Sequence, residues 1–179
     1  MTKDPETEEF MMILQFADKG NLRCILSNKF NRISWSSKIN SLSDLTMDLK
    51  TLHNLGYSHK DFHSGNIGCK FYFRLWIIWT SKWTKSDSKI YGVLPYIAPE
   101  VLNGEQYKLS SDIYSFGVIM AELSSGNPPF YDKEHNLNLA LAICDGLRPE
   151  FGKGTPEVYK KLAYKCMNAN SNQRMNYMI

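Results

Sequence analysis

This sequence has little excess of charge of either sign, and it has no long apolar run. The net charge is +3 in 179 residues, and the basic residues are scattered along the chain. The longest apolar stretch, FYFRLWIIW at 71–79, is too short to cross a bilayer and is interrupted by Arg74. The first ten residues, MTKDPETEEF, are acidic and polar, unlike a signal peptide. We therefore expect neither a nucleic-acid partner nor membrane association.

Paired cysteines are absent as well. No CxxC pair occurs and no histidine cluster has the spacing of zinc ligands, so neither a zinc site nor a disulfide framework is expected. Reduced, mostly buried thiols suit an intracellular compartment, and we expect a cytoplasmic protein. The four cysteines are Cys24, Cys69, Cys144 and Cys166.

What the sequence does contain is helical periodicity. Leucines recur at spacings of three and four residues within 35–56, which predicts a helix with one apolar face that ends at Gly56. A similar pattern predicts a helix at 112–125, with Asp112 as its cap and Gly126 as its end. The leucines of the first pattern are Leu42, Leu45, Leu49 and Leu52.

Shorter elements complete the predicted fold. Residues 137–144 and 156–167 are expected to be helices, the second with Thr155 as its N-cap. Asn21 is placed to cap a short helix that runs through Ser27. The compact apolar run FMMILQF at 10–16 predicts a buried strand. One early strand followed by several helices indicates an α+β fold that is mainly α.

The segment HKDFHSGN at 59–66 places an aspartate and an asparagine five residues apart, after the first long helix. On an irregular loop, two such side chains can converge on one phosphate. The aspartate accepts a proton from a substrate hydroxyl, and the asparagine amide oxygen helps to hold a magnesium ion. The pattern is His59-x-Asp61-x-x-x-x-Asn66. Taken alone, it is also compatible with a polar turn after a helix.

Three further motifs follow this segment. The sequence APE at 98–100 lies within YGVLPYIAPE, and SDIYSFGVIMAEL places Asp112 and Gly117 five residues apart at the start of a helix. Arg174 stands near the end of the chain. Together with the 59–66 segment, the order and spacing of these motifs resemble the protein kinase family, in the tyrosine-kinase-like style of catalytic loop.

The resemblance implies roles for the residues of the 59–66 segment. Asp61 matches the catalytic base of the family, and Asn66 matches the asparagine that binds magnesium. His59 matches the structural histidine of the same loop. Lys60 replaces the usual arginine beside the catalytic aspartate, and lysine cannot grip an activation-loop phosphate bidentately.

The resemblance also implies two supporting contacts. Glu100 matches the glutamate that pairs with a buried arginine of the last helices, here Arg174. Asp112 matches the aspartate that hydrogen-bonds the backbone of the catalytic loop from the following long helix. Both contacts would hold segments of the chain that lie far apart in sequence.

The segment FMMILQFADKGNL resembles the strand and hinge that join the two lobes of a kinase. This makes Leu14 the expected gatekeeper of the ATP site, although a simple core position explains this leucine as well. The backbone that would meet adenine belongs to Gln15, Phe16 and Ala17.

In family terms, residues 1–179 are expected to form a truncated protein kinase domain. Residues 1–18 would be the end of the small lobe and the hinge, and residues 19–179 the large lobe, ending within the last helix. The resemblance implies ATP and magnesium as cofactors. It also implies a protein as partner, either a substrate or a docking protein.

Several family elements do not occur in the sequence. There is no G-x-G-x-x-G loop, no VAIK-type lysine and no helix glutamate to pair with it, and we expect the chain to begin after these elements. The DFG element should lie between Asn66 and Ala98. The only aspartate within 67–90 is Asp87, and neither phenylalanine nor glycine follows it. ATP binding by this chain is therefore in doubt.

The segment that replaces DFG has two explanations. Read one base out of frame, suitable codons for residues 74–77 encode Asp-Tyr-Gly, a variant of DFG. We favour the hypothesis that a frameshift or a misplaced splice boundary has altered about fifteen residues here, and that the frame is restored before SDSKIYGVLPYIAPE. The alternative is a true hydrophobic insertion, which would be prone to aggregation in a surface loop.

Two smaller departures leave the acceptor residue open between serine or threonine and tyrosine. His63 stands where serine/threonine kinases commonly carry a lysine that faces the transferred phosphate. Val93 stands where they often have threonine.

Three functional hypotheses follow. The chain is an active kinase, or a non-catalytic binding module that docks partners through its substrate groove and the helix at 137–144, or the incomplete product of a longer kinase gene. The missing groups are those that hold the phosphates, which argues against an active kinase. We favour the third hypothesis, because the late start of the match to the family and the altered DFG region both point to it.

Overall fold

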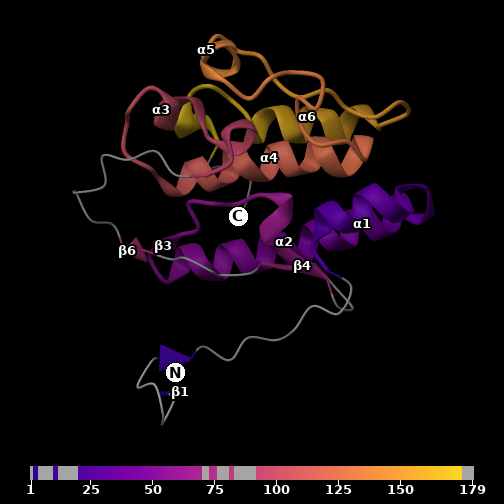
Figure 1. Ribbon diagram of the computed structural model, residues 1–179, viewed down its shortest axis with the longest axis horizontal. Helices are drawn as coiled ribbons and strands as arrows, with labels where there is room; N and C mark the ends of the chain where they lie inside the picture. Colours follow the sequence, from indigo (N-terminus) through magenta and orange to yellow (C-terminus); the bar gives the residue numbers. More distant parts are fainter. Residues whose placement is uncertain are drawn as a thin grey trace.

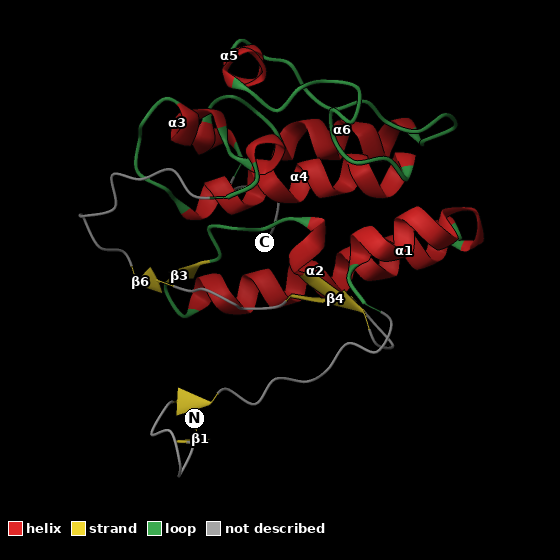
Figure 2. Ribbon diagram, in the orientation of Figure 1, coloured by secondary structure: helices red, strands yellow, loops and turns green. Residues whose placement is uncertain are grey.

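The computed structural model describes residues 20–69 and 92–174 throughout, together with short strands at 2–3, 10–11, 73–75 and 81–82. The described part is mainly helical (Figures 1 and 2). Its principal helices are α1 (Leu22–Lys29), α2 (Trp35–Asn54), α3 (Pro99–Leu102), α4 (Leu109–Ser125), α5 (Leu137–Cys144) and α6 (Glu157–Cys166). Short 3-10 helices are η1 (Phe30–Arg32), η2 (Ser64–Asn66), η3 (Leu94–Tyr96) and η4 (Ser171–Gln173).

Strands are short and occur in antiparallel pairs, and the described residues contain no sheet of more than two strands. The strand predicted at 10–16 is represented by β2, and its residues 12–16 lie outside the described part. The pairs are β1 (Thr2–Lys3) with β2 (Phe10–Met11), β3 (Tyr57–Ser58) with β6 (Ser81–Lys82), and β4 (Ile67–Cys69) with β5 (Phe73–Leu75).

Helix α4 is the centre of the fold. Figure 1 shows α1 and α2 on one side of α4, and α3, α5 and α6 on the other. Every residue of α4 from Ser110 to Ser124 is buried. A helix that is buried on all sides is expected at the centre of a helical domain, because other helices cover each of its faces.

Helix α2 confirms the helix predicted at 35–56. Its four predicted leucines are all buried. The helix ends at Asn54, and Gly56 follows in the left-handed conformation at φ +77°. Ser34 caps the start of the helix through a hydrogen bond from the Ser37 amide. This helix carries the chain to the 59–66 segment.

Two predicted helix starts are wrong in detail. Helix α4 begins at Leu109, three residues before Asp112, and the Lys108 amide donates to the Ser111 hydroxyl at 3.2 Å. Asp112 is therefore not a cap, and its carboxylate is used elsewhere. Helix α6 begins at Glu157, and the hydroxyl of Thr155 donates to the Gly152 carbonyl instead of capping it.

The other helix predictions are confirmed. Asn21 caps α1 through a hydrogen bond from the Cys24 amide, and this helix continues to Lys29. Residues 137–144 form α5 as predicted. Helix α4 ends at Ser125, and Gly126 follows as its C-cap with a left-handed φ of +80°. No helix of the described part is long and apolar enough to cross a membrane.

Candidate active site

The 59–66 segment forms a loop between α2 and α4, as Figure 2 shows. It follows the short strand β3 and ends with η2 (Ser64–Asn66), just before β4. His59 is buried, and its ring lies 5.6 Å from that of Phe62, which stacks in turn on Phe116 of α4 at 6.4 Å. These apolar contacts fix the loop against the central helix.

Asp112 anchors the beginning of the loop. It is fully buried in the first turns of α4, and its carboxylate accepts hydrogen bonds from the backbone N–H groups of His59 at 2.9 Å and Lys60 at 3.1 Å. The contact implied for Asp112 is thus present. Because Lys60 has a left-handed backbone, at φ +65°, these two amides can face the same carboxylate.

Two side chains complete the surroundings of Asp112, and neither was predicted from the sequence. The hydroxyl of Tyr107 donates to Asp112 Oδ1 at 2.6 Å, and His53 Nε2 lies 2.8 Å from Oδ2. A buried carboxylate needs several donors to replace water, and these four contacts supply them.

Asp61 and Asn66 lie side by side at the open end of the loop. The Asn66 amide nitrogen donates both to the backbone carbonyl of Asp61 and to its carboxylate Oδ2, each at 2.9 Å. Because both amide protons are used in this way, the amide oxygen of Asn66 is the atom left for a cation. The two residues that the sequence pattern singled out are therefore in direct contact.

The second carboxylate oxygen of Asp61 faces His63. Asp61 Oδ1 is buried and accepts no hydrogen bond of ordinary geometry from the described residues, and His63 Nε2 lies 3.4 Å from it. Interaction with His63, with a further contribution from Asn66, outweighs partial burial and lowers the pKa of Asp61. The carboxylate is therefore ionised at neutral pH, as a proton acceptor must be.

Beside this loop lies a polar cluster that the sequence did not predict, which we call the Glu122 cluster (Arg23, Ser64, Tyr96 and Glu122). All of its members except Arg23 are buried. The Ser64 and Tyr96 hydroxyls donate to the Glu122 carboxylate at 2.9 and 2.6 Å. Arg23 of α1 donates to the Tyr96 hydroxyl at 2.9 Å and to Ser64 at 3.2 Å. Burial raises the pKa of Glu122, because it disfavours the charged form more than these donors favour it.

Glu100 and Arg174 form a second buried unit away from the loop. Both guanidinium Nη atoms of Arg174 donate to the Glu100 carboxylate at 2.8 Å, and neither side chain is more than 5% exposed. The pairing implied by the resemblance is present. Burial alone would raise the pKa of Glu100, but Arg174 and the Ser111 hydroxyl more than offset it, so the net pKa is lowered.

Several sequence predictions lie outside the described residues. They include the hinge residues Leu14, Gln15, Phe16 and Ala17, Asp87, and most of the segment between Cys69 and Gly92. Gly92, the first residue described after that segment, lies beside the loop, because a Cβ built on it would be 3.5 Å from Asp61 Oδ1. The structure thus brings the 92–97 segment to the edge of the site.

The fit to a magnesium ion is partial. Within the described part of the chain, no group of three or more histidine, cysteine or acidic side chains could hold a metal ion. Asn66 offers one amide oxygen next to the Asp61 carboxylate. Magnesium prefers six oxygen ligands, some of them water, so these residues supply only a fraction of a complete site.

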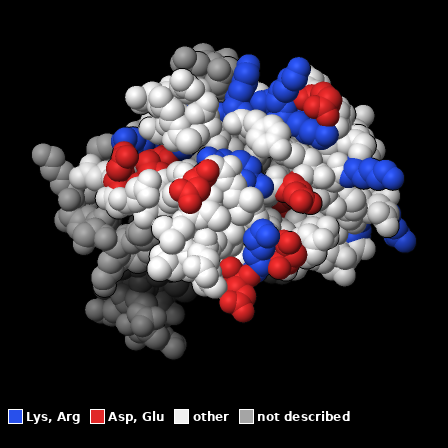
Figure 3. All heavy atoms as spheres, turned by 90° about the horizontal axis from the view of Figure 1, so that it is seen from above, with Lys and Arg blue, Asp and Glu red and all other residues white. Residues whose placement is uncertain are grey.

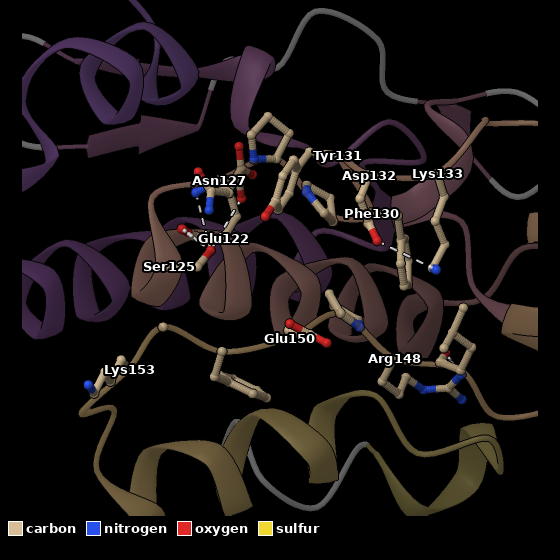
Figure 4. Close-up of a pocket in the computed structure, with 16 residues that line it drawn as sticks. Glu122, Ser125, Asn127, Phe130, Tyr131, Asp132, Lys133, Arg148, Glu150 and Lys153 are labelled. Carbon is tan, nitrogen blue, oxygen red and sulfur yellow. Dashed lines mark hydrogen bonds and ion pairs between the residues drawn. The ribbon is translucent and has the colours of Figure 1, made fainter.

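Glu122 also lines a pocket of about 410 Å³. Figure 4 shows its two walls, the loop with Asn127 and Phe130 and the segment with Arg148 and Glu150. Acidic and basic side chains both face this pocket, so charge alone does not select a ligand for it.

Comparison with known proteins places these motifs in context. The family model described as "Protein tyrosine and serine/threonine kinase" matches residues 2–178. A protein of Acanthamoeba polyphaga mimivirus, described as a serine/threonine-protein kinase/receptor, is 30% identical over 91% of this chain. A Dictyostelium discoideum protein, described as a LIM domain-containing serine/threonine-protein kinase, is 25% identical over 92% of it. The chain spans 10% and 26% of the length of these two relatives.

Proposed function

The chain belongs to the protein tyrosine and serine/threonine kinase family, and from this premise we propose that its 59–66 loop is the acceptor side of a phosphoryl-transfer site. A protein hydroxyl would give its proton to Asp61 as its oxygen attacks the γ-phosphorus of ATP. The bond from that phosphorus to the bridging oxygen of ADP would then break. The described helices correspond, on this proposal, to the large lobe of the kinase fold.

One observation carries the proposal. The Asp61 carboxylate is ionised and fixed at Oδ2 by Asn66, while its other oxygen accepts no hydrogen bond of ordinary geometry from the described residues. A carboxylate held in this way can accept a proton from a hydroxyl placed at hydrogen-bond distance. Asn66 would hold magnesium through its amide oxygen, and bound magnesium would neutralise charge on the phosphates.

We further propose that these 179 residues do not complete the reaction by themselves. The sequence contains neither a Gly-rich loop nor a DFG element, and phosphoryl transfer depends on groups that position and neutralise the phosphates. The loop would therefore keep the acceptor chemistry, whereas ATP would be bound too weakly for useful turnover.

The test combines ligand binding with phosphate transfer. A ligand that binds only the folded state must raise the melting temperature. Because we propose that ATP binds very weakly, we expect that millimolar MgATP leaves the melting temperature of the purified chain unchanged. We also expect no more transfer to a mixed serine, threonine and tyrosine peptide library than an Asp61→Asn variant shows. A rise in melting temperature together with Asp61-dependent transfer would show that the chain is a catalyst as it stands.

A second candidate function is a non-catalytic binding module, and exposed apolar residues on α5 favour it. Leu137 is 73% and Leu141 55% exposed, and they lie one helical turn apart. Figure 3 shows the molecule from above Figure 1, with charged side chains of both signs interspersed on this face. An apolar site between such charges suits a protein partner better than a polyanion.

A pull-down from cell extract tests this candidate. A partner that docks on α5 should be lost when Leu137 and Leu141 are both changed to glutamate. It should be retained by Val158→Glu, which changes an equally exposed residue of α6. Equal losses from both variants would argue against a docking site on α5.

A further inference from the structure

We propose that His63 is a positioning residue that holds the Asp61 carboxylate through its Nε2–H group, and that the Gly65 amide sets its tautomer. This inference rests on the proposed function of Asp61 as proton acceptor. It concerns a histidine that stands where serine/threonine kinases commonly carry a lysine.

The first step is the tautomer of the ring. The backbone N–H of Gly65 donates to His63 Nδ1 at 3.1 Å, so this nitrogen is an acceptor and carries no proton. In a neutral imidazole the proton must then be on Nε2. The Gly65 amide thereby makes Nε2 the donor nitrogen of the His63 ring.

The second step is the orientation of the ring. A Cβ built on Gly65 would lie 2.7 Å from His63 Cε1, so only glycine lets the ring lie this close to the backbone. On another side the ring lies 5.8 Å from that of Tyr96, a member of the Glu122 cluster. His63 also caps η2 through the same Gly65 contact, which ties its rotamer to the fold of the loop.

The third step is the partner of Nε2. This atom lies 3.4 Å from Asp61 Oδ1, which is buried and accepts no hydrogen bond of ordinary geometry from the described residues. Asn66 holds Oδ2 at 2.9 Å. On this proposal a donor faces each carboxylate oxygen, and the two donors together fix the plane of the carboxylate.

The decisive experiment is nuclear magnetic resonance of the full chain labelled with ¹⁵N-histidine. We expect the His63 ring to be the neutral Nε2–H tautomer, with an Hε2 signal that is protected from solvent exchange. In Asp61→Ala this proton should exchange about fivefold to tenfold faster, the effect of losing one hydrogen bond. A His63 ring protonated on Nδ1, or Hε2 exchange that does not respond to Asp61→Ala, would overturn the inference.

Variants of His63 separate positioning from packing. His63→Phe keeps a ring against Tyr96 but removes the donor, so the Asp61 side-chain resonances should shift and broaden. His63→Gln keeps an N–H donor and should restore them toward those of the unchanged chain. His135→Gln, far along the chain in a segment that follows α4, is the control and should leave Asp61 unaffected. If His63→Gln behaves like His63→Phe, the role of His63 is only structural.

This result can be told apart from that of the proposed function. MgATP binding and phosphate transfer do not enter the spectroscopic measurement. Phosphate transfer that survives Asp61→Asn would reject Asp61 as the proton acceptor and would leave the contact with His63 standing. A His63 ring protonated on Nδ1 would reject the contact and would leave the proposed role of Asp61 untouched.

Discussion

At the scale of single residues, Asp112 has the largest structural role in the site. It is fully buried and meets two backbone amides, a tyrosine hydroxyl and a histidine ring nitrogen. We expect Asp112→Ala to lower the free energy of unfolding by about 3 kcal/mol, because buried donors would lose a charged acceptor. Urea denaturation would measure the loss, and hydrogen exchange should accelerate at the amides of His59 and Lys60.

The matched control is Asp132→Ala. The Asp132 side chain is 60% exposed and pairs with Lys133 at 3.6 Å, so its removal should change the free energy of unfolding by less than about 1 kcal/mol. Equal effects of the two substitutions would mean that the buried contacts of Asp112 do not stabilise the loop.

Asp112 also shows where residue-level prediction stops. From sequence alone it was assigned both as a helix cap and, through the family resemblance, as the anchor of the loop, and only the second contact is present. A polar residue near a helix start suggests a cap, but nothing local reveals a partner more than fifty residues away. The Glu122 cluster was missed for the same reason, although a glutamate within the apolar run of 113–123 was a usable signal.

At the scale of elements, the packing of α4 against α6 depends on one glycine. A Cβ on Gly117 would lie 2.6 Å from Met167 Cγ and 2.9 Å from the Ala163 carbonyl. We expect Gly117→Ala to lower the free energy of unfolding by about 1–3 kcal/mol, because the clash outweighs the better helix propensity of alanine. Thermal denaturation would measure it.

The control for Gly117→Ala is Lys161→Ala, which introduces the same residue at an exposed position of α6. This substitution should change the free energy of unfolding by no more than about 0.5 kcal/mol. A stabilised Gly117→Ala variant would show that α4 and α6 can separate without loss.

The elements themselves were largely predictable. Periodicity located α2, since the leucine spacing of a helix with one buried face is a strong local signal. The starts of α4 and α6 were less predictable, because Thr155 and Asp112 have alternative partners in the folded chain. In the site, too, local contacts were easier to predict than distant ones. The contact between Asp61 and Asn66 follows from their five-residue spacing. The contacts of Tyr107 and His53 with Asp112 depend on tertiary packing.

At the scale of the whole molecule, Arg174 joins its own C-terminal segment to α3 and α4, which lie far from it in the sequence. Its guanidinium pairs with Glu100 of α3 and donates to the carbonyls of Ser110 in α4 and Ala169 near the C-terminal end of the described part. The packing of these segments therefore depends on the charge of the buried Glu100 carboxylate, and that dependence can be measured through pH.

Two glutamates act in opposite directions on the pH dependence of stability. The pKa of Glu100 is lowered in the folded state from its usual value of 4.5, so its contribution is present above pH 4.5 and is lost as the pH falls below that value. The pKa of Glu122 is raised above 4.5, so the folded state gains stability as the pH falls toward 4.5 from the region just above it. Stability should therefore pass through a maximum near this pH.

Substitution of each glutamate by glutamine should remove one side of this maximum. In Glu122→Gln, the gain on acidification above pH 4.5 should disappear, because no proton is taken up there on folding. In Glu100→Gln, the loss below pH 4.5 should become shallower, and the neutral-pH stability should drop by about 3 kcal/mol because Arg174 keeps a buried charge without a partner. Denaturant titrations of both variants across the acid range would measure the slopes. Parallel curves for the unchanged chain and Glu100→Gln would mean that the Arg174 pair does not link the fold to pH.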